Sequence, residues 1–340
     1  MKTKLSKRPA KARRKIAEPP ARPRIREILA TTDFSDASRE GVRYAVGLAE
    51  KLGAAVSLLH VIESPAWTSG AEAIPLLRDD SAVTARARSQ LATLAQHESN
   101  GNVAVTSSLR TGKPFHEIVT AARERGAGLI VLATHGYTGV NRVLLGSTAE
   151  RVVRHASCPV LTVPTRSTPK RIGKIFPFKL KKVLVPIDFS NISKNALPWA
   201  TFLAQQFGAE LILLHVTEKF PIDYLLGREL MSETIVPLMK QAEAELKHLG
   251  KSLSKSMGVN GSAVVRDGTP FEEICNTAET LGAELIVLTT HGYTGLKHTW
   301  LGSTAERVVR HAPCPVLVVR NSESDFFPES SEKKDLERYT

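Results

Sequence analysis

The stretch Thr134-His-Gly-Tyr-Thr-Gly139 recurs as Thr290-His-Gly-Tyr-Thr-Gly295, and the segment 145–156 recurs at 301–312 as Leu-Gly-Ser-Thr-Ala-Glu-Arg-Val-Val-Arg-His-Ala. Between 134–163 and 290–319, 23 of 30 positions are identical. A period of about 156 residues is far longer than the units of solenoids and propellers. The chain of 340 residues therefore contains two copies of a whole domain, each of ordinary size.

Three shorter repeats extend the match toward the start of each copy. Asp33-Phe-Ser matches Asp188-Phe-Ser, Leu59-His-Val matches Leu214-His-Val, and the segment 110–118 matches 266–274. These repeats place the two domains at 26–164 and 182–320. The remaining segments are a basic tail at 1–25, a basic linker at 165–181 and an acidic tail at 321–340.

The formal net charge of +12 lies almost entirely outside the two copies. Residues 1–26 contain eleven Lys and Arg and a single acid, and 164–182 contain seven Lys and Arg and no acid. The segment 321–340 contains six acids and three bases. The copies themselves are close to neutral. The N-terminal tail is poor in large apolar residues, so we expect it to be disordered, either simply solvated or in contact with nucleic acid or another polyanion.

Several classes of protein are excluded by composition. The longest apolar runs, such as 128–133, have the length of a strand, so the sequence predicts no membrane-spanning helix and no membrane partner. No apolar segment follows the basic N-terminus, so we expect no secretory signal. Cys158, Cys275 and Cys314 are too few for a disulfide scaffold and lack zinc-site spacing. These features predict a cytoplasmic protein.

Strand and helix patterns alternate within each copy. Alternation of this kind predicts an α/β fold: two tandem, doubly wound, Rossmann-like domains, each with a five-stranded parallel sheet. Copy two is expected to repeat the order of copy one from Lys182 to Arg320. The strands expected in copy one are Ile25–Thr31, Ala55–Ile62, Val103–Leu109, Leu129–Thr134 and Pro159–Val163. The expected helices are Ser38–Leu52, Leu76–His97, Pro114–Arg125 and Ser147–His155.

Doubly wound sheets bind ligands beyond the carboxyl ends of their strands, where the strand order reverses. Two loops of each copy leave such strand ends. The first contains Asp33 or Asp188, and the second is the glycine-containing loop 135–147 or its copy, which ends at Ser303. The second loop opens a helix, and backbone N–H groups at a helix N-terminus favour anions such as phosphate.

These residues resemble the universal stress protein family, whose nucleotide-binding members carry Gly-x2-Gly-x9-Gly-(Ser/Thr) after the fourth strand. The sequence has Ala133-x2-Gly136-x9-Gly146-Ser147 in copy one and Thr289-x2-Gly292-x9-Gly302-Ser303 in copy two. Asp-Phe-Ser and Leu-His-Val are also like the family. The resemblance covers both copies, and five segments occur in the right order twice.

The resemblance implies an adenine-nucleotide site in each copy, for ATP, ADP or AMP. Magnesium would be bound through the phosphates, since no protein ligand or metal site is evident. Copy one should bind better, because Ala133 crowds the phosphates less than Thr289 does. The residues implied at the adenosine end are Asp33, Val61, Asp188 and Val216. Those implied around the phosphates are Gly136, Gly146, Ser147, Thr148, Gly292, Gly302, Ser303 and Thr304.

The same residues also have purely structural interpretations. Ser147 and Glu150 have the spacing of a capping box, as do Ser303 and Glu306. Asp33 and Asp188 are alternatively caps of the helices that follow them. The remaining alternatives are turn positions for Gly136 and Gly139, loop-orienting hydrogen bonds for His135 and His291, satisfied core histidines for His60 and His215, and buried small apolar positions for Cys158 and Cys314.

Catalytic motifs are not evident: the sequence has no P-loop, no Gly-x-Gly-x-x-Gly, no nucleophile elbow and no kinase signature. No catalytic residue is therefore predicted. The leading hypothesis is a tandem universal stress protein that binds adenine nucleotide as a stress-response sensor or protective factor without efficient catalysis. The alternatives are an interaction scaffold with degenerate sites that contacts nucleic acid or another polyanion through its tail, and a slow ATPase.

The last strands of the two copies, 158–163 and 314–319, are nearly identical and apolar. Left unpaired, each would be an aggregation-prone sheet edge. Members of the family pair their last strands, so we expect an antiparallel pairing within the chain, which makes a pseudo-dimer and leaves room for further homo-oligomers.

Overall fold

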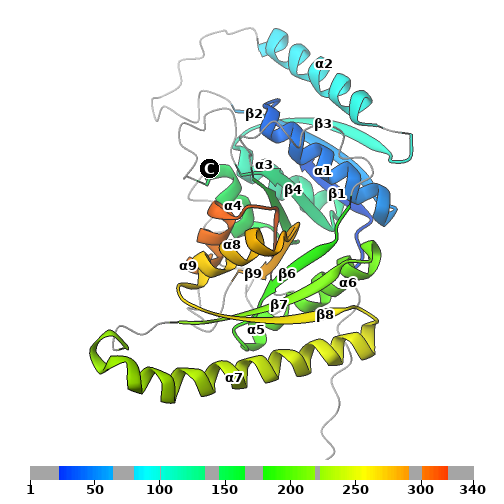
Figure 1. Ribbon diagram of the computed structural model, residues 1–340. Helices are drawn as coiled ribbons and strands as arrows, with labels where there is room; N and C mark the ends of the chain where they lie inside the picture. The colour runs from blue at the N-terminus through cyan, green and yellow to red at the C-terminus, as the bar shows by residue number, and fades with distance from the viewer. Residues whose placement is uncertain are drawn as a thin grey trace, which may run out of the picture.

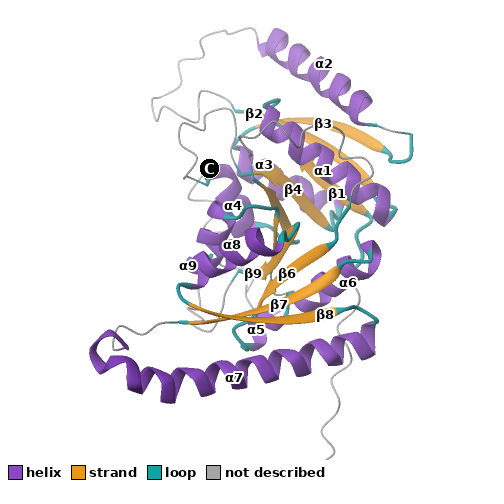
Figure 2. Ribbon diagram, in the orientation of Figure 1, coloured by secondary structure: helices purple, strands orange, loops and turns teal. Residues whose placement is uncertain are grey.

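A computed structural model describes residues 23–63, 80–99, 101–134, 145–164, 179–218, 223–290 and 301–320. Its described strands form one ten-stranded sheet between two layers of helices (Figures 1 and 2). The strand order is β3-β2-β1-β4-β5-β10-β9-β6-β7-β8. Most of the basic tail, the linker and the acidic tail lie outside the described residues.

The first half of the sheet contains the elements of copy one. They are β1 (Glu27–Thr31), α1 (Asp36–Leu52), β2 (Ala55–Ile62), α2 (Asp80–Glu98), β3 (Val105–Thr111), α3 (Pro114–Arg125), β4 (Leu129–Ala133), α4 (Ser147–His155) and β5 (Val160–Val163).

Copy two forms the second half of the sheet. Its elements are β6 (Lys182–Pro186), α5 (Asn191–Lys194), α6 (Leu197–Phe207), β7 (Glu210–Thr217), α7 (Asp223–Met257), β8 (Gly261–Asp267), α8 (Pro270–Leu281), β9 (Leu285–Thr289), α9 (Ser303–His311) and β10 (Val316–Val319).

The strands within each half are parallel, whereas β5 and β10 pair antiparallel at the centre, with Leu161 opposite Leu317. The Thr162 hydroxyl also donates to the Val316 carbonyl oxygen at 3.3 Å. The predicted pairing of the last strands is confirmed. Because the central pair is antiparallel, the carboxyl ends of the two halves lie at opposite edges of the sheet.

Each face of the sheet is covered by helices from both copies. Alternate residues of a strand point to opposite faces, so Ile28 and Val131 join one apolar cluster and Leu29 and Ile130 join the other. The first cluster includes residues of α1, α2, α6 and α7, and the second includes residues of α3, α4, α8 and α9. Helices on both faces of a sheet that is parallel within each half confirm the predicted α/β class.

Several predicted boundaries are wrong by one or two residues. The helix predicted from Ser38 begins at Asp36, because Ser35 is its N-cap and accepts a hydrogen bond from the Ser38 N–H at 3.2 Å. The predicted start of the second helix, 76–79, lies outside the described residues. The glycine stops are confirmed: Gly53 and Gly126 end helices in the left-handed conformation, with φ of 65° and 64°.

Copy two does not repeat copy one in every helix. The counterpart of α1 is split into α5 and α6, and Pro198 is the second residue of α6. Proline has no N–H to donate and disfavours helical backbone before it, which explains the break. The helix α7 has 35 residues, against 19 in α2, and extends along the bottom of Figure 1.

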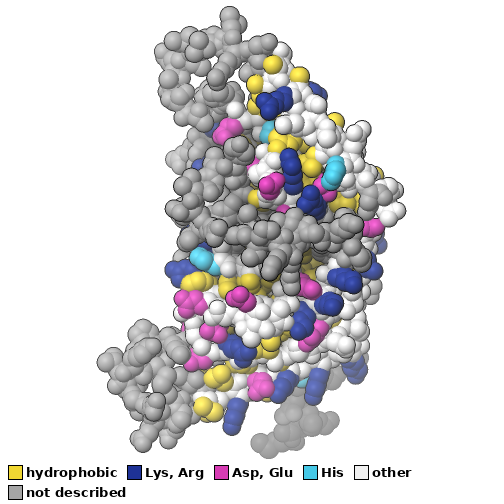
Figure 3. All heavy atoms as spheres, turned by 45° about the horizontal axis from the view of Figure 1, so that its top comes forward, with side chains coloured by type: hydrophobic (Ala, Val, Ile, Leu, Met, Phe, Trp, Pro, Cys, Tyr) yellow, Lys and Arg dark blue, Asp and Glu magenta, His cyan; other side chains and the backbone are white. Residues whose placement is uncertain are grey.

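Charged side chains of both signs alternate over the described face in Figure 3, with no large area of one sign. This distribution agrees with the near-neutral charge of the two copies. Among the described helices, none has the length and apolar character needed to cross a membrane.

Candidate functional site

The strand registers bring the predicted adenosine-end residues of copy one together at the carboxyl edge of the sheet. Thr31 lies opposite Leu59, and Ala30 lies opposite Val131. The Thr32 N–H continues the ladder by donating to the Leu59 carbonyl oxygen at 2.9 Å. If the registers of β1 are extended by two residues into the loop, Asp33 falls at the level of Val61 on one side and of Thr134, the residue after β4, on the other. The site therefore lies where strand order reverses.

The same arrangement is present in copy two. Pro186 lies opposite Leu214, and Leu184 lies opposite Ile286. Extending these registers places Asp188 between Val216 and Thr290. Val61 and Val216 are half-buried and pack against the apolar cluster that contains α3 and α8.

The loop after β1 is held by its own side chains. The half-buried Asp33 carboxylate accepts from the backbone N–H of Ser35 at 3.1 Å and from its hydroxyl at 2.5 Å. Asp188 accepts from the Ser190 N–H at 3.0 Å. Ser35 and Ser190 are the N-caps of α1 and α5. The interpretation of the aspartates as the helix caps is therefore wrong, because each shapes the turn that precedes the cap.

An aromatic pair packs beneath this loop in each copy. Phe34 lies on the ring of His60, with centroids 4.3 Å apart, and Phe189 lies on His215 at 4.6 Å. The Nδ1 atoms of the two histidines lie 2.7 Å and 2.8 Å from the carbonyl oxygens of Thr32 and Ile187. These contacts agree with a structural role for the histidines. Sequence reasoning missed the phenylalanines, although the repeated Asp-Phe-Ser contained the signal.

The start of α4 is tied back to the end of β4. The Gly146 N–H donates to the Thr134 carbonyl oxygen at 2.8 Å, and the Gly302 N–H donates to the Thr290 carbonyl oxygen at 2.7 Å. Since Thr134 and Thr290 directly follow β4 and β9, the neighbours of β1 and β6, these bonds bring the N-termini of α4 and α9 to the same carboxyl edges as the loops that contain the two aspartates. The described phosphate-end residues therefore share an edge with the aspartate of their copy.

The capping-box interpretation of Ser147 and Ser303 is wrong. The N-caps of α4 and α9 are Gly146 and Gly302, and no side chain caps either helix. Ser147 is the first residue of α4 and is exposed. The Glu150 carboxylate does not reach back to the start of the helix but accepts from the Arg154 guanidinium, with Oε1 and Nη2 2.6 Å apart. Because no side-chain oxygen covers the first turn, its backbone N–H groups suit an anion.

Some predicted site residues cannot be placed in this way. Gly136, Gly292, His135 and His291 lie outside the described residues. Ala133 ends β4 and is half-buried, while Thr289 ends β9 and is only 8% exposed. That Thr289 crowds the phosphates of copy two stays a prediction.

An arginine at the same edge was also missed by sequence reasoning. Arg110 lies opposite Val61, and Arg266 lies opposite Val216. Arg110 donates to Glu124 and to Glu117, and the hydrogen bond to Glu124 is the main cause that raises its pKa. Arg266 instead donates to the Val265 carbonyl oxygen at 3.3 Å. The matching Arg110 and Arg266 of the repeated segments were the available signal.

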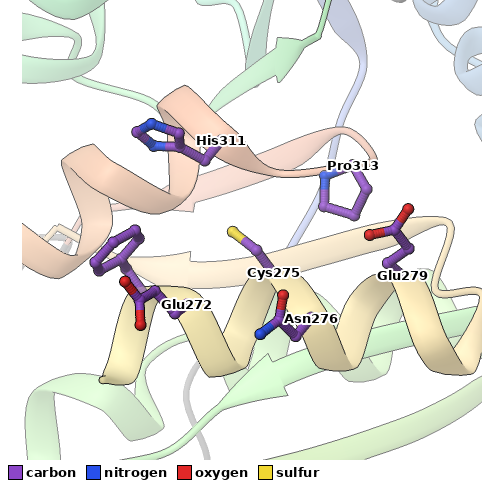
Figure 4. A pocket seen from close by; sticks show the side chains of 7 residues that line it. Glu272, Cys275, Asn276, Glu279, His311 and Pro313 are labelled. Atoms are coloured by element: carbon purple, nitrogen blue, oxygen red, sulfur yellow. The ribbon is translucent and has the colours of Figure 1, made fainter. Parts of the chain in front are cut away.

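Two open grooves of the described surface lie away from this edge. One, of about 380 Å³, lies between α8 and α9, where the Cys275 side chain points (Figure 4). Burial raises the pKa of Cys275 to about 11, so its thiol is unreactive at neutral pH. The other groove, of about 470 Å³, lies between α7 and β8. Cys314 is buried as predicted, and the described residues contain no cluster of three metal-ligating side chains.

Comparison with known proteins gives a consistent result for both copies. Residues 24–164 and 179–320 each match the profile of the universal stress protein family. A universal stress protein of Methanocaldococcus jannaschii is 37% identical over 145 residues, which cover 43% of this chain and 85% of that protein. One from Mycolicibacterium smegmatis is 25% identical over 306 residues, covering 86% of this chain and 96% of that protein.

A solved structure is similar over both copies. The universal stress protein from Archaeoglobus fulgidus aligns with a TM-score of 0.65 over 88% of this chain and 97% of that chain. The identity is 23%, so this likeness is one of fold.

Proposed function

The chain belongs to the universal stress protein family, and from that premise we propose that each copy binds an adenine nucleotide, ATP, ADP or AMP, at its carboxyl edge. The protein would act as a stress-response sensor or protective factor without efficient catalysis.

The observation that supports this proposal most is the pairing of unlike groups at one edge. Asp33 lies in the loop that follows β1, Thr134 directly follows the neighbouring strand β4, and the Thr134 carbonyl oxygen accepts from the Gly146 N–H at the start of α4. A carboxylate accepts hydrogen bonds from sugar hydroxyls or base amino groups, whereas backbone N–H groups donate to phosphate oxygens. A ligand that satisfies both has hydroxyl or amino donors at one end and phosphate at the other, as a nucleotide does. The half-buried Val61 offers an apolar contact for the base.

The binding of magnesium would follow from the phosphates of the nucleotide. The carboxylates in the described part of each site are already engaged: Asp33 and Asp188 accept from their loops, and Glu150 and Glu306 are bound to arginines. We therefore propose that any divalent cation is held mainly by phosphate oxygens and water, as is common for Mg²⁺.

The residues at the start of α4 support binding better than turnover. Ser147 and Thr148 offer hydroxyl donors, and Glu150, the acidic residue of this turn, is bound to Arg154. A hydrolytic reaction needs a base that takes a proton from water, and a carboxylate held in an ion pair serves that role poorly.

The test substitutes valine for Gly146 and, separately, for Gly302. Both glycines have extended backbone, with φ and ψ of −58° and 136° for Gly146 and −57° and 142° for Gly302. Valine adopts such angles readily, so folding should be preserved. A valine side chain at the first turn blocks the approach of phosphate, and the loss of several hydrogen bonds of about 1 kcal/mol each should weaken ATP binding at least tenfold.

Each variant is the matched control of the other. Titration calorimetry of the wild type should show two sites for ATP, and either variant should retain one. If the wild type gives no heat with ATP, ADP or AMP, and acid extraction of the purified protein releases no nucleotide, the proposal fails. Chromatography of ATP incubated with the protein separates binding from slow hydrolysis, because progressive conversion to ADP would favour the ATPase alternative.

The charge of the N-terminal tail supports a second, separate proposal. Eleven Lys and Arg among residues 1–26 are suited to a polyanion such as DNA. Binding would weaken steeply with salt, because each neutralised phosphate releases counterions. Removal of residues 1–26 should abolish retention on a DNA column, and unchanged retention would reject this proposal.

A further inference from the structure

We propose that His60 and His215 are positioning residues, which hold the loops carrying Asp33 and Asp188 in the shape that binds nucleotide. The loops 32–35 and 187–190 are called the exit loops below. The inference rests on the proposed function, because it assigns the adenosine end of the ligand to these loops.

The exit loops contain strained backbone. Phe34 has φ of 66° and Phe189 has φ of 62°, and they are the described non-glycine residues with positive φ. A bulky L-residue is unfavourable in this left-handed region because its Cβ crowds the following carbonyl group. Such a conformation persists only where the surroundings impose it. The aspartate turn spans each phenylalanine from within the loop, and a contact from the neighbouring strand adds to it.

His60 and His215 supply that contact in two ways. The His60 Nδ1 lies 2.7 Å from the Thr32 carbonyl oxygen, and the His215 Nδ1 lies 2.8 Å from that of Ile187. A carbonyl oxygen can only accept, so Nδ1 carries the proton in each ring. The rings also lie on Phe34 and Phe189, tilted by 38° and 36°. Each histidine thus holds both the start of its exit loop and the strained residue.

Comparison of the two copies separates the histidine from other supports. In copy one, the Thr32 hydroxyl also accepts from the Phe34 N–H at 3.0 Å and lies 3.0 Å from the Ser38 hydroxyl. Copy two has Ile187 at this position, which has no hydroxyl, yet its exit loop has the same strained φ and the same ring contact. What the copies share is the histidine, the phenylalanine and the aspartate turn.

The position of the carboxylate depends on this backbone. Phe34 lies between Asp33 and Ser35, whose N–H donates to the Asp33 carboxylate at 3.1 Å. Rotation of Phe34 to a relaxed negative φ would redirect that N–H and open the turn. The aspartate would then lose its fixed place at the strand edge.

The experiment compares His60→Asn with His60→Leu. An asparagine side chain can place an N–H donor near the position of Nδ1, whereas leucine fills space without a donor. The affinity for ATP is measured by calorimetry in a Gly302→Val background, which leaves copy one as the ATP site observed. Because the glycine substitutions act at the phosphate end, both copies still bind adenosine, so the adenosine affinity is measured with His60 and His215 substituted together. We expect substitution to Leu to weaken both ligands by the same factor of about ten, and substitution to Asn to weaken them less than about threefold, since one hydrogen bond separates the variants.

A second comparison separates positioning from general damage. Gly146→Val acts at the phosphate end, so it should weaken ATP far more than adenosine. For ATP, His215→Leu in a Gly146→Val background should reproduce in copy two the result of His60→Leu in copy one. Equal losses for ATP and adenosine with a retained melting transition support positioning. Wild-type affinity in folded His60→Leu, or a loss for ATP alone, would overturn it.

The tautomer provides a test that needs no ligand. Nitrogen-15 NMR of the free wild-type protein should show Nδ1–H in both histidines. A neutral ring protonated at Nε2 and not at Nδ1 would overturn the inference, and this measurement needs neither a bound nucleotide nor a folded His60→Leu variant. If the wild type binds neither ATP nor adenosine, the proposed function fails and the positioning role fails with it. If the wild type binds and His60→Leu binds equally well, only the present inference fails.

Discussion

The antiparallel pairing of β5 with β10 predicts how substitutions of Leu161 and Leu317 change the free energy of unfolding. The two residues are directly opposite each other and each is 2% exposed. A Leu→Ala substitution removes three carbon atoms, worth about 0.8 kcal/mol each in transfer free energy, and it leaves a cavity. Each single substitution should therefore lower the free energy of unfolding by about 2.7–5 kcal/mol.

The two substitutions should not be additive. Directly opposed residues share one contact and one cavity, so the double variant should lose less than the sum, by about 0.5–3 kcal/mol. Urea denaturation followed by circular dichroism gives the four free energies of the cycle. Leu246→Ala is the matched control, because Leu246 is equally buried but lies on α7, which covers β7 and β8. Its combination with Leu161→Ala should be additive within about 0.5 kcal/mol.

The result that would refute this reasoning is a coupling free energy for Leu161 and Leu317 no larger than that of the control pair. The two last strands would then not face each other in solution, and the ten-stranded sheet would be two separate sheets. A coupling of 0.5 kcal/mol or more supports one sheet shared by both copies.

Three further predictions concern single sites. Burial raises the pKa of Cys275 to about 11, so about one thousandth of this thiol is ionised at pH 8. Its alkylation rate, followed by mass spectrometry, should therefore rise about tenfold per pH unit up to pH 10. A plateau of the rate near pH 8.5 would contradict this. Glu98 is 7% exposed and accepts from the Arg43 Nε at 3.2 Å, so Glu98→Gln should lower the free energy of unfolding in urea by about 1.5 kcal/mol, and wild-type stability would show that the pair contributes nothing. Thr289→Ala should raise the ATP affinity of copy two toward that of copy one in calorimetry, whereas an unchanged affinity would show that Thr289 does not crowd the phosphates.

Most elements of the sheet could be predicted from local patterns. The apolar run 129–133 became the buried strand β4, and the helix stops at Gly53 and Gly126 were found because glycine favours the left-handed conformation. Pro198 could also have predicted the break before α6. It was missed because copy two was expected to repeat the helices of copy one. The start of α1 lies two residues before the predicted one because Ser35, rather than a residue nearer Ser38, caps the helix.

The candidate site was predicted in outline and corrected in detail. Asp33 and Gly146 were placed at one edge by the order of the elements, which the registers of β1, β2 and β4 support. The capping box failed because a tertiary bond, from the Gly146 N–H to Thr134, sets where α4 begins, and because Glu150 binds Arg154. A spacing of residues cannot show which of two partners an acidic side chain takes.

The sequence by itself determined the tandem repeat, which is visible as repeated segments, and the class of fold, because apolar periodicity is a property of neighbouring residues. The pairing of the last strands was implied by the resemblance to the family. Only the tertiary structure decided how the exit loops are held. The conformation of Phe34 depends on His60, which reaches the loop from the neighbouring strand, 28 residues beyond the Thr32 carbonyl group that it binds. A strained backbone angle is stable only when its surroundings offset its energy, so it depends on packing between strands as well as on the hydrogen bonds of the residues beside it.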